Sequence, residues 1–202
     1  MKVYIEYPFV NGPWGGGNHF LSNIKKNFLK RGIICEKPED ADIILFNAHQ
    51  NFQEVISLKQ AYPDKVFIHR TDGIYKLYND IKDERQDIVN YLNSEVADAT
   101  IFQTQWAKDQ HVNFGLKNEN PFTIIGNACD TELFTNRPKS KSKKIKLICT
   151  SWSINKNKGF DYYEYLDKKL DFSKYSFTYV GNDPKINFKN IVKVPPLDRK
   201  DL

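Results

Sequence analysis

The sequence contains little sulfur and no long apolar run. Its cysteines, Cys35, Cys129 and Cys149, are odd in number, widely spaced and without metal-ligand spacing. This pattern excludes a disulfide framework and favours a reducing compartment. The sequence contains no run of about 18 apolar residues, so no membrane span is predicted. No apolar segment preceded by positive charge marks a signal peptide at the N-terminus. We therefore expect a cytoplasmic protein.

The excess of positive over negative charge is also small. The formal net charge of the 202 residues is +5, and the excess is concentrated between Arg137 and Lys146. Such a segment is either an arm that binds nucleic acid or a solvated linker. The linker is favoured because a new apolar run starts directly behind it, at Ile145. We therefore expect a linker over residues 137–144 and no nucleic-acid partner.

Short apolar runs do occur, and they alternate with segments of helical periodicity. The run 41–46 is apolar at every position except Asp42, which is typical of a strand buried on both faces of a parallel sheet. The pattern predicts a doubly wound, Rossmann-like α/β fold with a parallel sheet. We expect one such domain over residues 1–136 and the beginning of a second over residues 145–202. The strands are expected near residues 2–7, 33–35, 41–46, 66–68, 99–103, 122–125, 145–149, 177–180 and 191–194.

Three consecutive glycines, Gly15 to Gly17, separate the first predicted strand from a helix expected over residues 18–30. A loop without Cβ atoms lets the backbone approach a ligand, and a helix N-terminus offers free N–H groups to an anion. Asn18 is expected to cap this helix. The alternative interpretation is a flexible turn.

Polar clusters follow the predicted strands at several places. Ligands of open α/β sheets bind outside the carboxyl ends of the strands. The clusters are therefore expected to line one crevice. They are the glycine loop and residues 47–50, 69–73, 126–130 and 151–159.

Two of these clusters carry chemistry. His69 could hydrogen-bond a hydroxyl or accept a proton, and Arg70 could pair with a phosphate or carboxylate. The alternative is that Arg70 simply pairs with Asp72 and that His69 is a satisfied residue at the end of a strand. Lys158 and Gly159 precede a helix predicted over residues 160–170 and would suit a diphosphate. The alternative there is a surface lysine.

Taken in order, these motifs resemble the retaining, two-Rossmann-domain (GT-B) glycosyltransferases of the large group-one, family-four-like class. Members of that class have a glycine loop, a helix ending in Arg-Gly, and a strand ending in His. They also have an Asn-Gly-Val-Asp-x-x-x-Phe pattern and a later Lys-Gly. The matching residues here are Gly15–His19, Arg31-Gly32, His69–Gly73, Asn127–Phe134 and Lys158-Gly159.

The chain departs from the class in two respects. Ser151-Trp152-Ser153 stands where many members have an arginine. The acidic donor motif would lie beyond Leu202, so the resemblance implies a chain truncated within the donor domain.

The resemblance implies transfer of a sugar from a nucleotide-activated donor to an acceptor hydroxyl, with retention, without a cofactor and without an obligatory metal. The acceptor would be a glycan, a lipid or a small molecule, and contact with a membrane surface is an expectation. Oligomeric state stays open. The alternatives are a catalytically inactive remnant, a carbohydrate- or nucleotide-binding module, and an unrelated nucleotide-binding protein.

The same resemblance assigns roles to individual residues. Lys158 would stabilise the charge of the departing diphosphate, and His69 would contact sugar hydroxyls. The expected catalytic residues are His69, Arg70 and Asp72. The expected donor-binding residues are Gly15, Gly16, Gly17, Asn18, Ser153, Lys158 and Gly159. The expected acceptor-side residues are His49 and Asn127.

Overall fold

The structure is a computed structural model that describes all residues except 13, 118, 136–141, 184, 199–200 and 202. It divides into two compact units. The first comprises residues 1–10 and 16–128, and the second comprises residues 11–15 and 129–202. Most of the linker expected over residues 137–144 lies outside the described residues.

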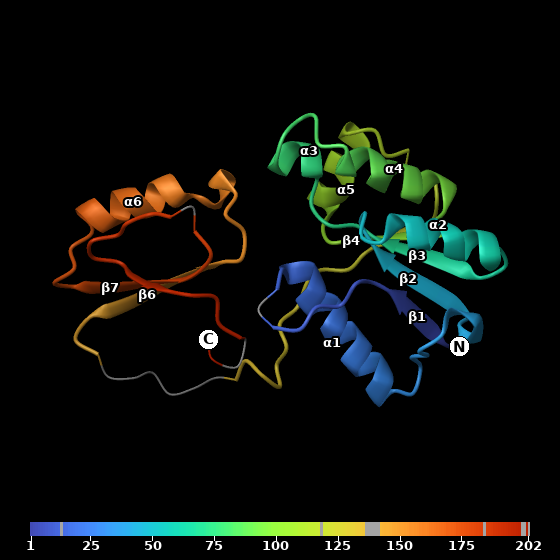
Figure 1. Ribbon diagram of the computed structural model, residues 1–202, viewed down its shortest axis with the longest axis horizontal. Coiled ribbons are helices and arrows are strands. Elements are labelled where there is room, and N and C mark those ends of the chain that lie inside the picture. The colour runs from blue at the N-terminus through green and yellow to red at the C-terminus, as the bar shows by residue number, and fades with distance from the viewer. Residues whose placement is uncertain (13, 118, 136–141, 184, 199–200, 202) are drawn as a thin grey trace. The chain divides into compact units, whose positions relative to one another are not determined.

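The first unit has a five-stranded parallel sheet in the order β1-β2-β3-β4-β5 (Figure 1). This confirms the predicted Rossmann-like α/β fold. The strands are β1 (Val3–Glu6), β2 (Ile43–Asn47), β3 (Val66–Arg70), β4 (Ala99–Phe102) and β5 (Phe122–Ile124). The helices are α1 (Gly16–Lys30), η1 (Pro38–Asp40), α2 (Phe52–Ala61), α3 (Tyr75–Tyr78), α4 (Arg85–Glu95) and α5 (Gln105–Asn113).

The direction of the chain across this sheet reverses at β1. The strand predicted over residues 33–35 is reduced to a single parallel bridge between Ile34 and Val3, on the side of β1 away from β2. The chain therefore leaves β1 in one direction and then runs through β2 to β5 in the other. Right-handed crossovers then put α1 on one face of the sheet and α2, α4 and α5 on the other, as Figure 1 shows. The carboxyl ends of β1 and β2 form the topological switch point, where open α/β sheets bind ligands.

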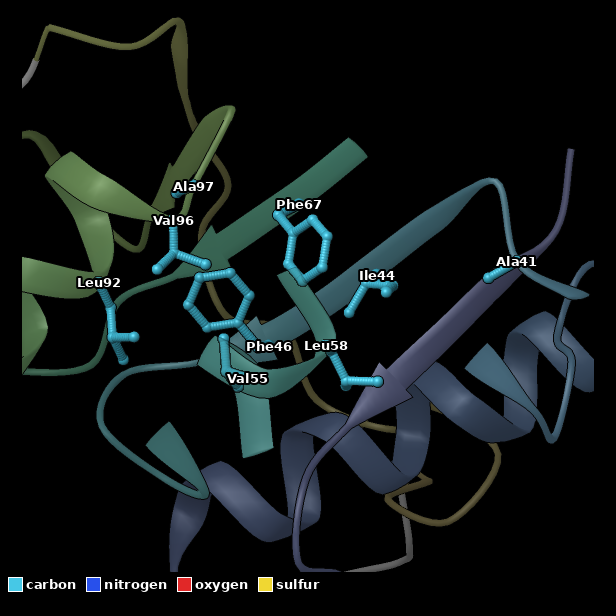
Figure 2. Packing of buried hydrophobic residues seen from close by; sticks show 9 residues of the cluster. All are labelled: Ala41, Ile44, Phe46, Val55, Leu58, Phe67, Leu92, Val96 and Ala97. Carbon is cyan, nitrogen blue, oxygen red and sulfur yellow. The ribbon is translucent and has the colours of Figure 1, made fainter. Parts of the chain in front are cut away.

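Both faces of this sheet carry a hydrophobic core, which explains why β2 reads as a continuous apolar run. Figure 2 shows the larger cluster, in which Ile44 and Phe46 of β2 pack with Val55 of α2 and Leu92 of α4. On the opposite face, Leu45 packs with Leu21 of α1. Alternate residues of one strand thus hold the two helix layers in place.

The second unit has a three-stranded parallel sheet in the order β6-β7-β8. Its elements are β6 (Ile145–Ser151), η2 (Lys156–Lys158), α6 (Phe160–Lys169), β7 (Tyr175–Gly181) and β8 (Val192–Val194). One face packs Phe177 and Tyr179 of β7 against Phe160 of α6. Asp167 of α6 is buried and accepts hydrogen bonds from three successive backbone N–H groups at residues 189–191. These bonds fix the approach to β8.

Candidate functional site

A buried guanidinium lies at the carboxyl ends of β2 and β3, beside the switch point. Arg70 is only 4% exposed. Its Nη1 donates to Asn47 Oδ1 at 2.6 Å and to Asp72 Oδ1 at 2.7 Å, and its Nη2 donates to Asn127 Oδ1 at 3.2 Å. The ring of Phe20 lies 4.0 Å from the guanidinium carbon. Arg70 is therefore neutralised and held in place from several sides, as the alternative interpretation of the Arg70–Asp72 pair has it.

Asp72 is the more accessible partner, with a side chain that is 23% exposed. Its Oδ2 accepts from Asn47 Nδ2 at 2.8 Å, and Gln103 Nε2 lies 3.4 Å from its Oδ1. A Cβ built on Gly17 would lie 3.5 Å from Asp72 Oδ2 and 3.6 Å from the Tyr7 hydroxyl. The first turn of α1 thus stands directly beside this carboxylate, with ordinary van der Waals room between them.

His69 lies in the core and does not face a ligand surface. It is fully buried and stacks on Phe46 with ring centroids 4.6 Å apart. Its Nε2 donates to the carbonyl of Ala48 at 3.0 Å, and its Nδ1 lies 3.4 Å from the amide nitrogen of Asn93. Burial lowers the pKa of His69 to about 3. The structure therefore does not support the expected contact between His69 and a sugar, because the ring is enclosed, neutral and already hydrogen-bonded.

A hydrogen-bonded relay behind Asp72 was not foreseen from the sequence. His111 Nε2 donates to the backbone carbonyl of Asp72 at 3.0 Å. Its Nδ1 accepts from Gln86 Nε2 at 3.1 Å, and Gln86 Oε1 accepts from the Tyr75 N–H at 3.1 Å. Burial lowers the pKa of His111, so the neutral ring keeps one proton, on Nε2. The relay fixes the main chain of Asp72 from α4 and α5.

The two expected acceptor-side residues occupy different surroundings. Asn127 belongs to the cluster around Arg70, and its Nδ2 donates to Gln103 Oε1 at 2.6 Å. His49 packs edge-on against Tyr75, with ring centroids 4.8 Å apart. Burial, together with the charge of Arg85, lowers the pKa of His49. His49 is therefore a neutral imidazole.

The glycine loop differs from its expected form. None of its three glycines has a positive φ; the left-handed residue is Gly12, just before them. The helix begins at Gly16, so Asn18 lies inside its first turn and is not the expected N-cap. Asn18 is buried, accepts from the Val10 N–H at 3.0 Å and donates to the Val10 carbonyl at 2.8 Å. Its amide is therefore occupied in holding the chain that leaves β1.

Gly15 belongs to the second unit. A Cβ built on Gly15 would lie 3.6 Å from the indole of Trp152. The expected donor-binding glycines are thus divided between the two units.

In the second unit, the loop after β6 is shaped by its own polar groups. Ser151 Oγ donates to the carbonyl of Ser153 at 2.8 Å, and Ser153 Oγ accepts from the Asn155 N–H at 3.1 Å. Lys158 ends the short η2, and Gly159 follows it with φ +81°, as the residue preceding α6. A left-handed residue at this point suits glycine. Three of the four expected residues of this unit, Ser153, Lys158 and Gly159, therefore lie within one loop that leads into a helix N-terminus.

The carboxyl ends of β6 and β7 approach each other closely. A Cβ on Gly181 would lie 1.9 Å from the carbonyl oxygen of Ser151, a distance that excludes any side chain. The N–H of Asn182 donates to the same oxygen at 2.9 Å, and its side-chain amide donates to the carbonyl of Trp152 at 2.8 Å. The glycine at position 181, the last residue of β7, is therefore required by packing between the strands.

The structure brings together Arg70, Asp72 and Asn127, which were expected to line one crevice, and adds side chains that were not among the expected site residues. Asn47 belongs to the cluster 47–50 that was expected to line the crevice, whereas Tyr7 and Gln103 were missed. Both lie just after the end of a buried strand, and this position was the signal that could have found them. Among the described residues, no group of three His, Cys, Asp or Glu side chains is arranged to hold a metal ion. No helix in the described part of the chain is long and apolar enough to cross a membrane.

The fold and the polar cluster define a Rossmann-like α/β protein with a second, smaller parallel sheet. No protein-family model matches the chain, and a search of curated proteins finds no significant match.

Proposed function

We propose that this chain is a glycosyltransferase that moves a sugar from a nucleotide-activated donor to an acceptor hydroxyl with retention. The observation that carries the proposal is the cluster at the switch point. There Asp72, Asn47 and Asn127 surround Arg70 beside the first turn of α1. Carboxylates and amides at such an edge suit the hydroxyl groups of a sugar, because they accept and donate hydrogen bonds in a fixed arrangement.

The cluster favours a neutral ligand over an anion in the first unit. Arg70 is the buried cation there, and its charge is already balanced by Asp72 at 2.7 Å. A phosphate placed beside Asp72 would meet a carboxylate and would gain little from a guanidinium that already donates to Asn47, Asp72 and Asn127. The first unit is therefore proposed to hold sugar hydroxyls, with Asp72 as the principal acceptor and Asn127 as a supporting residue.

The diphosphate is assigned to the second unit. The first N–H groups of a helix lack partners within the helix, so the start of α6 offers donors to an anion. Lys158 adds a positive charge at this helix start, while Asp161 in the first turn opposes an anion. Residues 129–202 contain 16 Lys and Arg and nine Asp and Glu, whereas residues 1–128 contain 14 and 16. The net charge of +7 for the second unit attracts anionic ligands.

Titration separates the two assignments. Binding of UDP-glucose, GDP-mannose, UDP and free glucose is measured by isothermal titration calorimetry and by ¹H–¹⁵N spectra. Asp72→Asn is expected to weaken sugar binding about tenfold and to leave UDP binding unchanged, since a charged acceptor is lost. Lys158→Ala is expected to do the reverse. Unchanged affinity of both variants for all four compounds would refute the proposal.

A binding module without turnover is the second candidate function. It is favoured by His69, which the resemblance assigns to the chemistry but which is enclosed in the core. Detection of free UDP or GDP released from the nucleotide sugars, with and without added acceptor sugars, distinguishes the two. Binding without release of nucleotide would leave the module as the function.

A further inference from the structure

The loop between β2 and α2 is held in a strained conformation beside the cluster. Ala48 and Asn51 both adopt left-handed backbone angles, with φ of 43° and 49°. Non-glycine residues occupy this region at a cost in free energy, and they stay there only when their surroundings hold them. Ala48 is, in addition, fully buried. The loop is therefore maintained by its contacts and not by local preference.

Those contacts hold every residue around His49. Ala48 is bonded through both of its backbone groups, Gln50 through its N–H, and Asn51 through its side-chain amide. The bonds are Ala48 N–H to Arg70 O (2.8 Å), His69 Nε2 to Ala48 O (3.0 Å), Gln50 N–H to Asn47 O (3.1 Å) and Asn51 Nδ2 to Glu6 Oε1 (2.8 Å).

His49 itself is the exception. In the part of the chain that the structure describes, its Nδ1 is the one buried side-chain polar atom without a hydrogen-bond partner. Buried polar atoms are nearly always paired, and leaving one unpaired is unfavourable. A strained loop fixes this residue while its ring nitrogen stays unsatisfied, which is the state expected of a group whose partner is a ligand.

The position of His49 connects it to Asp72. Asn47 Nδ2 donates both to Gln50 Oε1 at 3.0 Å and to Asp72 Oδ2 at 2.8 Å, so the loop and the carboxylate share one amide. The charge of Asp72 also acts on the pKa of His49, in the opposite direction to burial and Arg85. The imidazole stays neutral, so it can donate or accept one hydrogen bond and does not select for an anion.

We infer that Nδ1 of His49 binds a hydroxyl group of the same neutral sugar that Asp72 holds. This assignment rests on the proposed function and adds a second hydrogen-bonding point to it. The ring as a whole is partly exposed, so rotation about its Cβ–Cγ bond can turn Nδ1 toward the ligand. Tyr75, packed edge-on against the ring, forms the wall behind it.

Imidazole NMR tests the assignment directly. The ¹⁵N shift of His49 Nδ1 and the backbone amide signal of Asp72 are followed during titration with glucose, mannose, galactose, N-acetylglucosamine and UDP-glucose. Both signals are expected to move with the same sugar at the same concentrations. If a sugar moves the Asp72 signal but not that of His49, the inference is wrong and the proposed function stands. If no sugar moves either signal, the proposed function fails and the inference fails with it.

Substitutions provide a second measurement. His49→Phe keeps a flat aromatic ring, although a larger one, and removes both ring nitrogens, so sugar affinity is expected to fall about tenfold. The melting temperature is expected to stay equal or rise, because an unpaired atom is gone. His49→Asn places a polar atom near the position of Nδ1 and is expected to keep most of the affinity. Gln60→Ala, an exposed position on α2, is the matched control. Wild-type affinity in His49→Phe would overturn the inference.

Discussion

Acid should destabilise the first unit through His69. This ring is neutral in the folded protein because burial lowers its pKa from 6.5 to about 3, whereas in the unfolded chain it titrates normally. Below pH 6.5 this histidine therefore binds a proton in the unfolded chain but not in the folded protein, so the free energy of unfolding falls as the pH falls. The loss begins near pH 6.5 and continues until the pH reaches the folded-state pKa.

The size of the effect follows from these two pKa values. Between about pH 7.5 and about pH 5, one such group removes about 2 kcal/mol from the free energy of unfolding. Burial also lowers the pKa values of His49 and His111, so they add to the loss with the same sign. Carboxyl groups whose pKa values are lowered, such as Asp83 at about 2, lose their contribution only at lower pH.

Urea unfolding at the two pH values, followed at the amide signals of β2 and β3, measures this loss. His69→Gln is the informative variant, because its Nε2 can still donate to the Ala48 carbonyl and its side chain does not titrate. The variant is less stable at neutral pH, but its loss between the two pH values should be smaller than that of the wild type by about 2 kcal/mol. An identical pH dependence in both proteins would refute the reasoning.

Three further substitutions test the packing. Gly181→Ala should prevent β6 and β7 from pairing, because the added Cβ would lie 1.9 Å from the Ser151 carbonyl oxygen; loss of the β7 amide signals checks this. Asp167→Asn should lower the free energy of unfolding in urea by about 1–3 kcal/mol. The two carboxylate oxygens of Asp167 accept from three backbone N–H groups, and the substitution replaces one of these oxygens by an amide nitrogen, which donates. Asn18→Ala should release Val10 and speed proteolysis before α1 while the signals of β2 stay in place.

The fold could be predicted because its signals are local. A parallel strand covered on both faces must be apolar throughout, and β2 shows this over residues 43–46. The reversal at β1 was harder to see, because it depends on the single bridge at Ile34 and not on a full strand.

The polar cluster around Arg70 lies at the sheet edge that the sequence indicated, but the direction in which each side chain points was missed. Successive residues of a strand point to opposite faces. His69 lies two positions after Phe67, so it shares the face packed against α2 and α4, while Arg70 points to the other face and meets Phe20 of α1. Applying this alternation to β3 would have separated His69 from Arg70. The hydrogen bonds of Asn18 to Val10 and the relay through Gln86 could not be predicted. They join segments that come close together only when the chain is folded.

The relay has a consequence for how such a protein can change. The backbone carbonyl of Asp72 accepts a hydrogen bond from His111, which in turn is hydrogen-bonded to Gln86. Both His111 and Gln86 are buried. A substitution that alters the spacing of α4 and α5 would therefore move the carboxylate without touching any surface that meets a ligand. Selection for a new ligand can thus act on the buried residues of α4 and α5. Variants with altered preference would then have unchanged residues at the edge of the sheet, and their differences would lie in the helices behind it.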